Sequence, residues 1–457
     1  MRCAEQKPIR TALQRTFTLG EALAWAGTLV MLLILGAHFF RAGNSLAVVS
    51  IGGLLLFHAG TQAWKTCVVG LALVLGVLEW GMAAQTLAVT RMHMGAPWLR
   101  GAAILGTVAA LTALAASHTL AKAARQRKIV EAATFTQAAA FIVTFLALYG
   151  LRAGRPDVLL LERIFPAWGG IQIFLLSWYA GYIAGKLNTP RTSRKMRTTA
   201  WLIFTLVFFG QLGLGLSGVL GSALSGTPHI TIPGFILFAP AYRGTFSMMP
   251  FLVLAATLLA GSAWCSMLCY FGSIEAVAAT RKPVKKAPPF LRATIRYGRI
   301  SVLLIGLAAA FILRLTGVST EKTLILVAIF AVCSLVLMLF ASRKYTGMVH
   351  CTAFCPLGIA VNLLGRLSPW RIRIDTERCD GCGACEKACG YRALDVAHRA
   401  KGGAGITCSL CRDCIGACPH KAIFLKCFAL PARVSGNVFT VLVVMLHVVF
   451  VAAARPL

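Results

Sequence analysis

Residues 379–390 read CDGCGACEKACG, and residues 408–419 read CSLCRDCIGACP. Each stretch has the spacing C-x2-C-x2-C-x3-C. Three cysteines at x2 spacing present three thiolates to one face of a 4Fe–4S cubane, and the fourth cysteine, three residues on, ligates the other cluster of a pair. The two stretches therefore predict a small α+β domain with two clusters and crossed ligand sets.

The expected ligands of these two clusters are eight cysteines. The first cluster takes Cys379, Cys382, Cys385 and Cys418, and the second takes Cys408, Cys411, Cys414 and Cys389. Two C-x2-C pairs also suit structural zinc, but eight cysteines in two such stretches exceed the four ligands that zinc needs. We therefore expect iron–sulfur clusters here rather than zinc.

The composition of the whole chain is that of a membrane protein. The 457 residues are 58% hydrophobic and only 13% charged, whereas an average soluble protein is about 25% charged. This excludes a soluble globular enzyme, a disordered chain and a coiled coil. The expected fold is an all-α polytopic membrane bundle with the small α+β two-cluster domain attached.

About eleven stretches are apolar and long enough to cross a bilayer, which takes ~20 residues in a helix. They are residues 19–40, 44–64, 66–90, 99–121, 131–151, 169–186, 199–220, 246–264, 300–317, 323–341 and 436–454. Residues 221–245 are also apolar but are broken by Gly and Pro. We expect them to form an outer loop or a re-entrant segment.

The net charge of +31 indicates how the chain is oriented in the membrane. The chain has 45 Lys and Arg against 14 Asp and Glu, and in membrane proteins Lys and Arg collect in cytoplasmic loops. With the N-terminus inside, the basic runs fall on one side together with the cysteine-rich domain, and the C-terminus lies in the periplasm. The excess charge thus predicts a protein in contact with membrane lipid, and no nucleic-acid partner.

Two C-x3-C pairs carry a weaker signal. Cys265 and Cys269 follow the eighth apolar stretch, and Cys351 and Cys355 follow the tenth. On a helix, residues i and i+4 share a face, so each pair offers two thiolates to one site. The four cysteines together match either a third cluster at the membrane surface or a redox-active dithiol system, while free cysteines also pack as small apolar residues.

Other polar residues in the apolar stretches are candidates for proton, quinone or haem chemistry. Glu79 is a candidate for proton relay to a quinone, or for a hydrogen bond between helices, because an ionisable group at that depth is unfavourable without a role. Four histidines are haem candidates: His38 and His93 near the outer face, and His58 and His118 nearer the inner face. His229 and His447 are unassigned. We do not expect haem b, because isolated histidines in helices are more often structural.

The paired C-x3-C motifs, the Cys355-Pro356 step and the two-cluster domain resemble the NapH/NosR type of membrane-bound ferredoxin over residues 165–430. The resemblance implies quinone-linked electron transfer across the bacterial cytoplasmic (inner) membrane. The chain departs from the pattern at Tyr270, where the second pair has Pro356, and at Gly390, where a bacterial ferredoxin has proline. The first five helices and the last helix are additions to it.

These features lead to one expected organisation and function. The expected regions are a five-helix membrane region (1–160), a membrane core with the first pair (161–345), the second pair and ferredoxin domain (346–435), and a last helix (436–457). We expect an electron-transfer subunit between quinone and the clusters, with no catalytic residue in this chain alone. Its partners would be a flavoprotein, cytochrome or iron–sulfur subunit of a membrane redox complex.

Three alternative functions stay open at the level of sequence. They are a maturation or regulatory redox protein for a periplasmic metalloenzyme, a haem-containing electron conduit and an ion-pumping redox subunit. A pump should carry more acidic residues within the membrane than Glu79, which makes it the weakest of the three.

Overall fold

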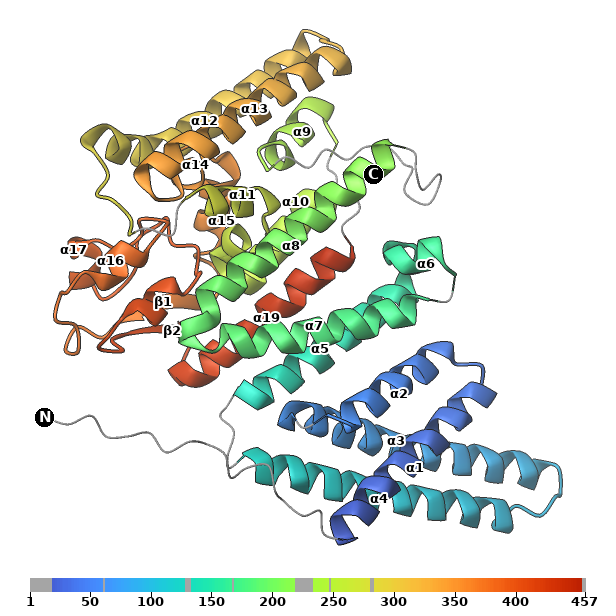
Figure 1. Ribbon diagram of the computed structural model, residues 1–457. Coiled ribbons are helices and arrows are strands. Elements are labelled where there is room, and N and C mark those ends of the chain that lie inside the picture. The colour runs from blue at the N-terminus through green and yellow to red at the C-terminus, as the bar shows by residue number, and fades with distance from the viewer. Residues whose placement is uncertain are drawn as a thin grey trace, which may run out of the picture. The chain divides into compact units, whose positions relative to one another are not determined.

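The computed structural model describes residues 19–60, 62–127, 133–166, 168–217, 233–245, 248–279 and 283–453. The chain forms two compact units, Met1–Thr134 and Phe135–Leu457, which Figure 1 draws together. The cysteine motifs all lie in the second unit. Each unit is described by itself below.

The described residues of the first unit form four helices. They are α1 (Leu19–Arg41), α2 (Ser45–His58), α3 (Ala63–His93) and α4 (Leu99–Arg127). The two long helices α3 and α4 run side by side as a hairpin (Figure 1). Gly70 allows this close approach, because a Cβ atom there would lie 2.6 Å from Leu120 Cδ2.

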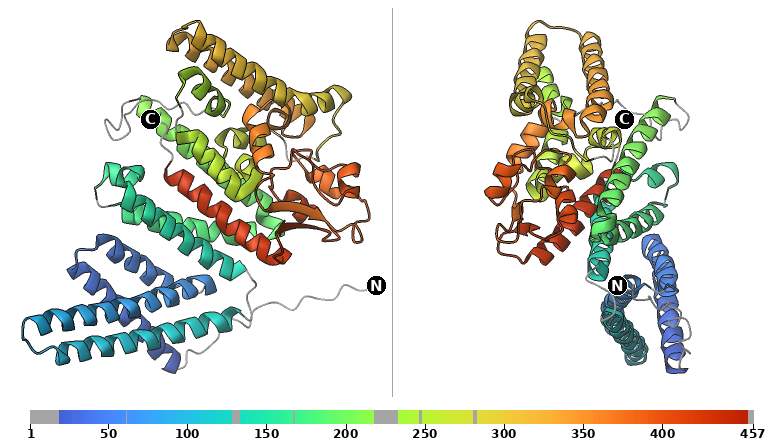
Figure 2. Two further views of the ribbon diagram at one scale, coloured as in Figure 1. Left: turned by 180° about the vertical axis from the view of Figure 1, so that it is seen from behind. Right: turned by 60° about the vertical axis from the view of Figure 1, so that its left-hand side comes forward.

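The second unit is built mainly from helices that lie side by side (Figure 2). They are α5 (Ala133–Gly154), α6 (Leu160–Ile164), α7 (Gly169–Leu187), α8 (Pro190–Leu216), α9 (Phe235–Arg243), α10 (Met248–Ala260), α11 (Tyr270–Ala278), α12 (Pro289–Leu315), α13 (Thr320–Tyr345), α14 (Val349–Ala353), α15 (Pro356–Leu364) and α19 (Ala432–Ala452). Three of them, α8, α12 and α15, begin at a proline. Proline suits a first helical turn because no helical hydrogen bond needs its missing N–H.

Nine helices in the described parts of the chain are long and apolar enough to cross a membrane. They are Leu19–Arg41, Ala63–His93, Leu99–Ala124, Thr134–Gly154, Thr192–Gly215, Met249–Leu268, Pro289–Leu315, Thr320–Tyr345 and Ala432–Ala452. The other two expected spans form α2, which has only 14 residues, and α7, which has 19. The protein is thus mostly helical with several membrane-type helices, and the count of eleven stays a prediction.

The ferredoxin domain joins α15 to α19 and contains a two-stranded sheet. Strands β1 (Trp370–Ile374) and β2 (Ile423–Cys427) pair antiparallel, with Trp370 opposite Cys427. In both strands the first, third and fifth residues are buried, which is the alternation of a sheet with one covered face. Three short helices complete the domain: α16 (Ala384–Ala388), α17 (Val396–Ala400) and α18 (Asp413–Ala417).

Two boundaries differ in detail from the sequence-based expectation. The compact units part after Thr134, so the fifth helix belongs to the second unit, whereas the expected region ended at residue 160. The four-part division itself stays a prediction. Residues 218–232, within the expected re-entrant segment, lie outside the described residues, and Phe235–Arg243 forms the short helix α9.

Candidate metal centres

The first expected ligand set surrounds one cavity in the ferredoxin domain. Cys379, Cys382 and Cys385 line it, together with Cys418 from the second stretch. Cys379 and Cys382 precede α16, Cys385 lies within it, and Cys418 follows α18. The fourth sulfur is therefore supplied by the other stretch, which is the crossed arrangement that the spacing predicts and the donor set that a 4Fe–4S cubane needs.

The second expected set is more deeply buried. The thiol of Cys389 interacts electrostatically with Cys408 and Cys411, and that of Cys414 interacts with all three. Burial raises the pKa of the Cys408 thiol to about 12 and raises those of Cys389 and Cys414 as well. Because isolated thiolates are unfavourable in such surroundings, metal binding is what would keep these four sulfurs deprotonated.

The two stretches fold as a repeat with the same backbone. Gly381 and Gly383 have φ values of 77° and 73°, and Leu410 and Arg412, at the equivalent places of the second stretch, have 52° and 64°. A positive φ is ordinary for glycine but uncommon for bulky residues. The same loop shape therefore recurs in the second stretch although its residues disfavour it.

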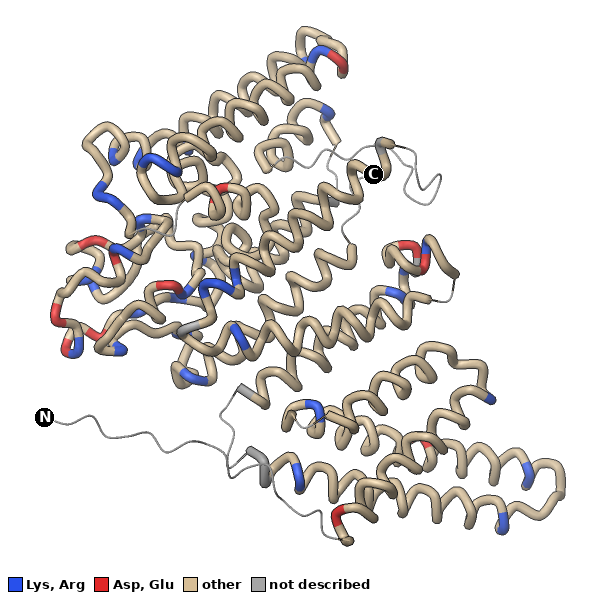
Figure 3. Tube along the Cα trace, viewed as in Figure 1, with Lys and Arg blue, Asp and Glu red and all other residues tan. Residues whose placement is uncertain are grey.

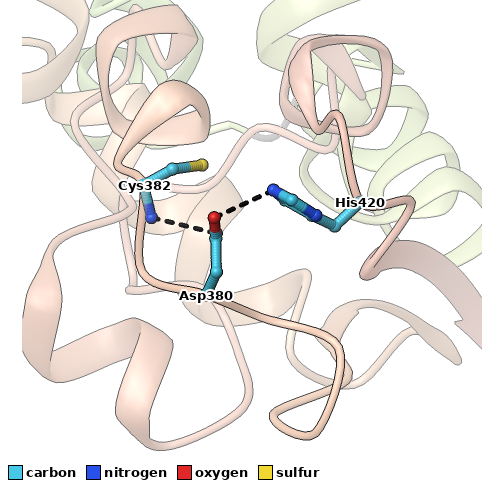
Figure 4. Close-up of side chains that lie close together, drawn as sticks. All are labelled: Asp380, Cys382 and His420. Carbon is cyan, nitrogen blue, oxygen red and sulfur yellow. Dashed lines mark hydrogen bonds and ion pairs between the residues drawn. The ribbon is translucent and has the colours of Figure 1, made fainter.

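An exposed ion pair lies beside the first set (Figure 4). Asp380 Oδ2 lies 2.9 Å from His420 Nε2, and Asp380 Oδ1 accepts a hydrogen bond of 3.1 Å from the backbone N–H of Cys382. That N–H lowers the pKa of the Asp380 carboxyl. Asp380, Cys382 and His420 also form a possible three-ligand metal group, but the Cys382 sulfur already belongs to the cavity of the first set.

The two C-x3-C pairs lie together around a second cavity. Cys265, Cys269, Cys351 and Cys355 all line it. Cys265 lies in a π-helical turn (Trp264–Leu268), a feature that often marks functional sites. Cys351 lies in α14. The structure thus brings together four sulfurs from two motifs that are 86 positions apart; that they bind a cluster stays a prediction.

The second cysteine of each pair occupies the same structural position. Cys269 precedes the first residue of α11, and Cys355 precedes the first residue of α15. The backbone N–H groups of Phe271 and Gly272 interact electrostatically with the Cys269 sulfur, and those of Leu357 and Gly358 interact with the Cys355 sulfur. Backbone amides near a cluster's sulfurs are a means by which proteins tune cluster potentials.

Two charged residues at this cavity were not singled out from the sequence. Glu275 in α11 is fully buried, and its carboxylate accepts hydrogen bonds from Ser342 Oγ at 2.6 Å and from the backbone N–H groups of His350 and Cys351 at 2.6 and 3.0 Å. Arg299 in α12 lines the cavity itself. Neither lies inside an expected apolar stretch, since Glu275 follows residues 246–264 and Arg299 directly precedes residues 300–317. The argument applied to Glu79 therefore did not reach them.

The ferredoxin domain forms one wall of this cavity. Tyr391, Thr407 and Ser409 line it opposite the membrane helices. The Tyr391 hydroxyl donates to the carbonyl oxygen of Cys265 at 3.0 Å, and Ser266 Oγ donates to that of Ser409 at 2.8 Å. Tyr391 and Ser409 are close neighbours in sequence of Cys389 and Cys408, so the second ligand set and the C-x3-C site share a wall.

Glu79 and the candidate histidines do not join these sites in the described residues. Glu79 Oε1 lies 3.1 Å from His38 Nε2, which links α3 to α1. His58 donates to the carbonyl oxygen of Trp25 at 3.0 Å. His93 is exposed, and His118 is half-buried. His229 lies outside the described residues.

His447 in α19 has a separate hydrogen-bonded environment in the second unit. Its Nδ1 lies 3.2 Å from the carbonyl oxygen of Met267, so Nδ1 carries the proton. Its Nε2 then accepts from the Tyr179 hydroxyl at 3.4 Å. Both ring nitrogens are thus engaged by α7 and by the π-helical turn.

Comparison with known proteins identifies 4Fe–4S binding domains in this chain. Two family models, each described as a 4Fe–4S binding domain, match it. One covers residues 372–395, with the first four-cysteine stretch. The other covers residues 242–287 and 323–375, with both C-x3-C pairs. No solved structure matches the chain significantly.

Three curated proteins are similar to parts of the chain. An uncharacterized protein of Methanocaldococcus jannaschii is 19% identical over 54% of this chain and 92% of its own. YccM of Escherichia coli, whose name assigns it provisionally to electron transport, is 29% identical over 18% of this chain and 23% of its own. A ferredoxin of Pyrobaculum islandicum is 39% identical over 12% of this chain and half of its own. The chain is therefore a ferredoxin-type 4Fe–4S protein with membrane-type helices and a redox, electron-transfer role.

Proposed function

We propose that this chain is a membrane-integral electron-transfer subunit of the NapH/NosR type, which passes electrons between the quinone pool and its iron–sulfur clusters. The observation that carries the proposal is the cavity of the two C-x3-C pairs. Its four sulfurs converge between membrane-type helices, and its opposite wall belongs to the ferredoxin domain. Clusters bound at the three sets of cysteines would supply one-electron transfer between neighbouring sites.

The burial of the cysteines suggests the order in which electrons pass between the two ferredoxin ligand sets and the C-x3-C site. In the first set, Cys382 is exposed and Cys379 half-buried, which suits exchange with another protein. The second set includes the buried Cys389 and Cys414, and it borders the C-x3-C cavity through Ser409. Electrons would thus pass between a partner, the first set, the second set and the membrane helices.

A neighbouring apolar cavity supports the quinone part of the proposal. It touches the same site through Cys269, Cys351 and Cys355. Its other lining includes Phe330 and Met338 of α13 and His350, whose buried Nδ1 has no hydrogen-bond partner among the described residues. A mostly apolar pocket with a few polar groups is the usual setting for a small cofactor, and a quinone carbonyl would complete the bonding of His350.

The charge distribution supports the expected orientation. In the second unit, Lys and Arg gather mainly around the ferredoxin domain, and the middles of the helices carry few charges (Figure 3). We therefore propose the bacterial cytoplasmic membrane as the location, with the ferredoxin domain and the N-terminus in the cytoplasm and the C-terminus in the periplasm. Both ends of the chain, 1–18 and 454–457, lie outside the described residues. As partners we propose a flavoprotein, cytochrome or iron–sulfur subunit.

Iron and acid-labile sulfide per purified chain test the proposal. Three cubanes hold about twelve iron atoms and the ferredoxin pair alone about eight. We expect about twelve in the wild type and about eight in Cys351→Ser, with Cys333→Ser, an exposed cysteine of α13, as the control at about twelve. Reduction of the clusters by added quinol should then require the third site. About eight iron atoms in the wild type would leave four free thiols and contradict the third cluster.

A further inference from the structure

Arg299 is a buried cation beside the sulfurs of the C-x3-C pairs. It is 3% exposed and lines the cavity of the C-x3-C pairs. Its charge interacts with Cys265, Cys351 and Cys355. Among the described residues it interacts with no carboxylate, and its Nε has no hydrogen-bond partner.

A buried, unpaired charge is strongly unfavourable unless an opposite charge compensates it. Glu275 does not fill this role, because no ion pair joins it to Arg299 among the described residues, and its carboxylate accepts instead from Ser342 and from two backbone N–H groups. Four neutral thiols, or two disulfides, would leave the Arg299 guanidinium uncompensated. The cavity is therefore built for an occupant with negative charge.

We propose that Arg299 is the counter-cation of an anionic cluster in this cavity and raises its reduction potential. This inference rests on the third cluster of the proposed function. Four thiolates give an oxidised 4Fe–4S centre a net charge of two negative units, and reduction adds one electron without forming or breaking a bond. The added charge appears beside the guanidinium, so Arg299 stabilises the reduced state more than the oxidised state.

The position of Arg299 gives this effect a direction. The electron donor or acceptor on the ferredoxin side would be the set that includes Cys408 and Cys389, whose close neighbours in sequence, Ser409 and Tyr391, line the cavity. A higher potential at the C-x3-C site shifts the equilibrium of electrons toward the membrane helices. Arg299 thus acts through its charge on the reduction potential of the cluster, and it contacts no substrate in this role.

A redox titration of the full-length chain in detergent, followed by electron paramagnetic resonance, tests this role. The component that is absent from Cys265→Ser is assigned to the C-x3-C site. In Arg299→Gln we expect the equilibrium constant for reduction of that component to fall at least about tenfold, which is about 59 mV for one electron. Arg299→Lys, which keeps the charge, should retain most of the potential.

Arg296→Gln is the matched control. It removes the same charge from the same helix, but Arg296 is exposed, so the potential of the C-x3-C component should not change. Loss of that component in Arg299→Gln together with its retention in Arg299→Lys would also support the proposal. An unchanged potential in Arg299→Gln with about twelve iron atoms overturns the role of Arg299 alone, and so does loss of the component in both variants. About eight iron atoms in the wild type instead overturns the third cluster and the inference with it.

Discussion

The guanidinium of Arg197 in α8 donates a hydrogen bond of 2.7 Å to Asp413 Oδ2, and the side chains are only 6% and 7% exposed. Asp413 is the residue between Arg412 and Cys414, within the second four-cysteine stretch. A membrane-type helix is thus joined directly to a ligand loop. Because the pair is buried, it holds the loop in a fixed position against α8.

Arg197→Ala should loosen the ferredoxin domain from α8. The change removes the buried partner of the Asp413 carboxylate and leaves it only the longer, half-exposed contact with Arg194. Loss of one partner of a buried pair destabilises a protein by up to about 3–5 kcal/mol. We expect a lower thermal transition of the domain and slower electron transfer between the second set and the C-x3-C site. Calorimetry and stopped-flow reduction measure the two effects.

Arg194→Ala is the control for that variant. Arg194 Nε lies 3.8 Å from the same Asp413 oxygen, and its side chain is half exposed, so its loss should change stability by less than about 1 kcal/mol. Equal effects of the two variants would show that the buried pair has no special role in docking.

Serine substitutions test the crossed ligand sets of the ferredoxin domain. Cys389→Ser should damage the cluster held mainly by Cys408, Cys411 and Cys414, because these sulfurs lie together. Cys418→Ser should damage the other cluster, because Cys418 lines the cavity of the first stretch. Spectroscopy that resolves the two clusters measures this, and loss of the cluster nearest in sequence would contradict the crossed assignment.

Glu275→Ala should remove the C-x3-C site while the ferredoxin domain stays loaded. The change leaves the backbone N–H groups of His350 and Cys351 buried without their acceptor, and each such group is unfavourable by about 1–3 kcal/mol. We expect iron to fall from about twelve to about eight atoms per chain. Ser342→Ala removes one donor and keeps the carboxylate, so it should retain more iron; a full complement in Glu275→Ala would refute the role of Glu275.

A double-mutant cycle of His38→Ala and Glu79→Gln tests what Glu79 does. If the 3.1 Å contact between them mainly holds α1 to α3, the cycle should give a coupling of about 0.6 kcal/mol, typical of hydrogen bonds between membrane helices. The coupling is measured by unfolding in detergent. A coupling near zero with loss of quinol-dependent reduction would favour the proton-relay interpretation instead.

The cysteine spacing predicted the ferredoxin domain and the grouping of its sulfurs because ligand geometry is local. Cys379, Cys382 and Cys385 must share one face whatever surrounds them. The apolar stretches likewise predicted helices at nearly every expected position. Helix ends and the number of spans were less certain, since α2 has only 14 residues and α7, although it has 19, is not among the nine membrane-type helices.

Contacts between charged residues and cysteines that are far apart in the sequence could not be predicted in the same way. Glu275 and the N–H of Cys351 are 76 positions apart in sequence, and Arg299 meets cysteines from both pairs. Only the packing of α11 and α12 brings them to one cavity. Hydrophobic pattern predicts that these helices exist but carries no information about which of their polar residues meet.

The positive φ values of Leu410 and Arg412 mark the two halves of the ferredoxin repeat as unequal. The Arg412 guanidinium donates to Thr440 Oγ1 of α19 at 2.9 Å, and Leu410 is buried against Gly261 beside α10. Two residues with an unfavoured backbone conformation thus contact the membrane-type helices. Gly381 and Gly383 occupy the equivalent positions in the other half, which contains the exposed Cys382. The second half of this domain, with larger residues at these loop positions, is therefore the half fixed to the membrane-type helices, and the first half, with glycines and the exposed Cys382, is the half left accessible to solvent.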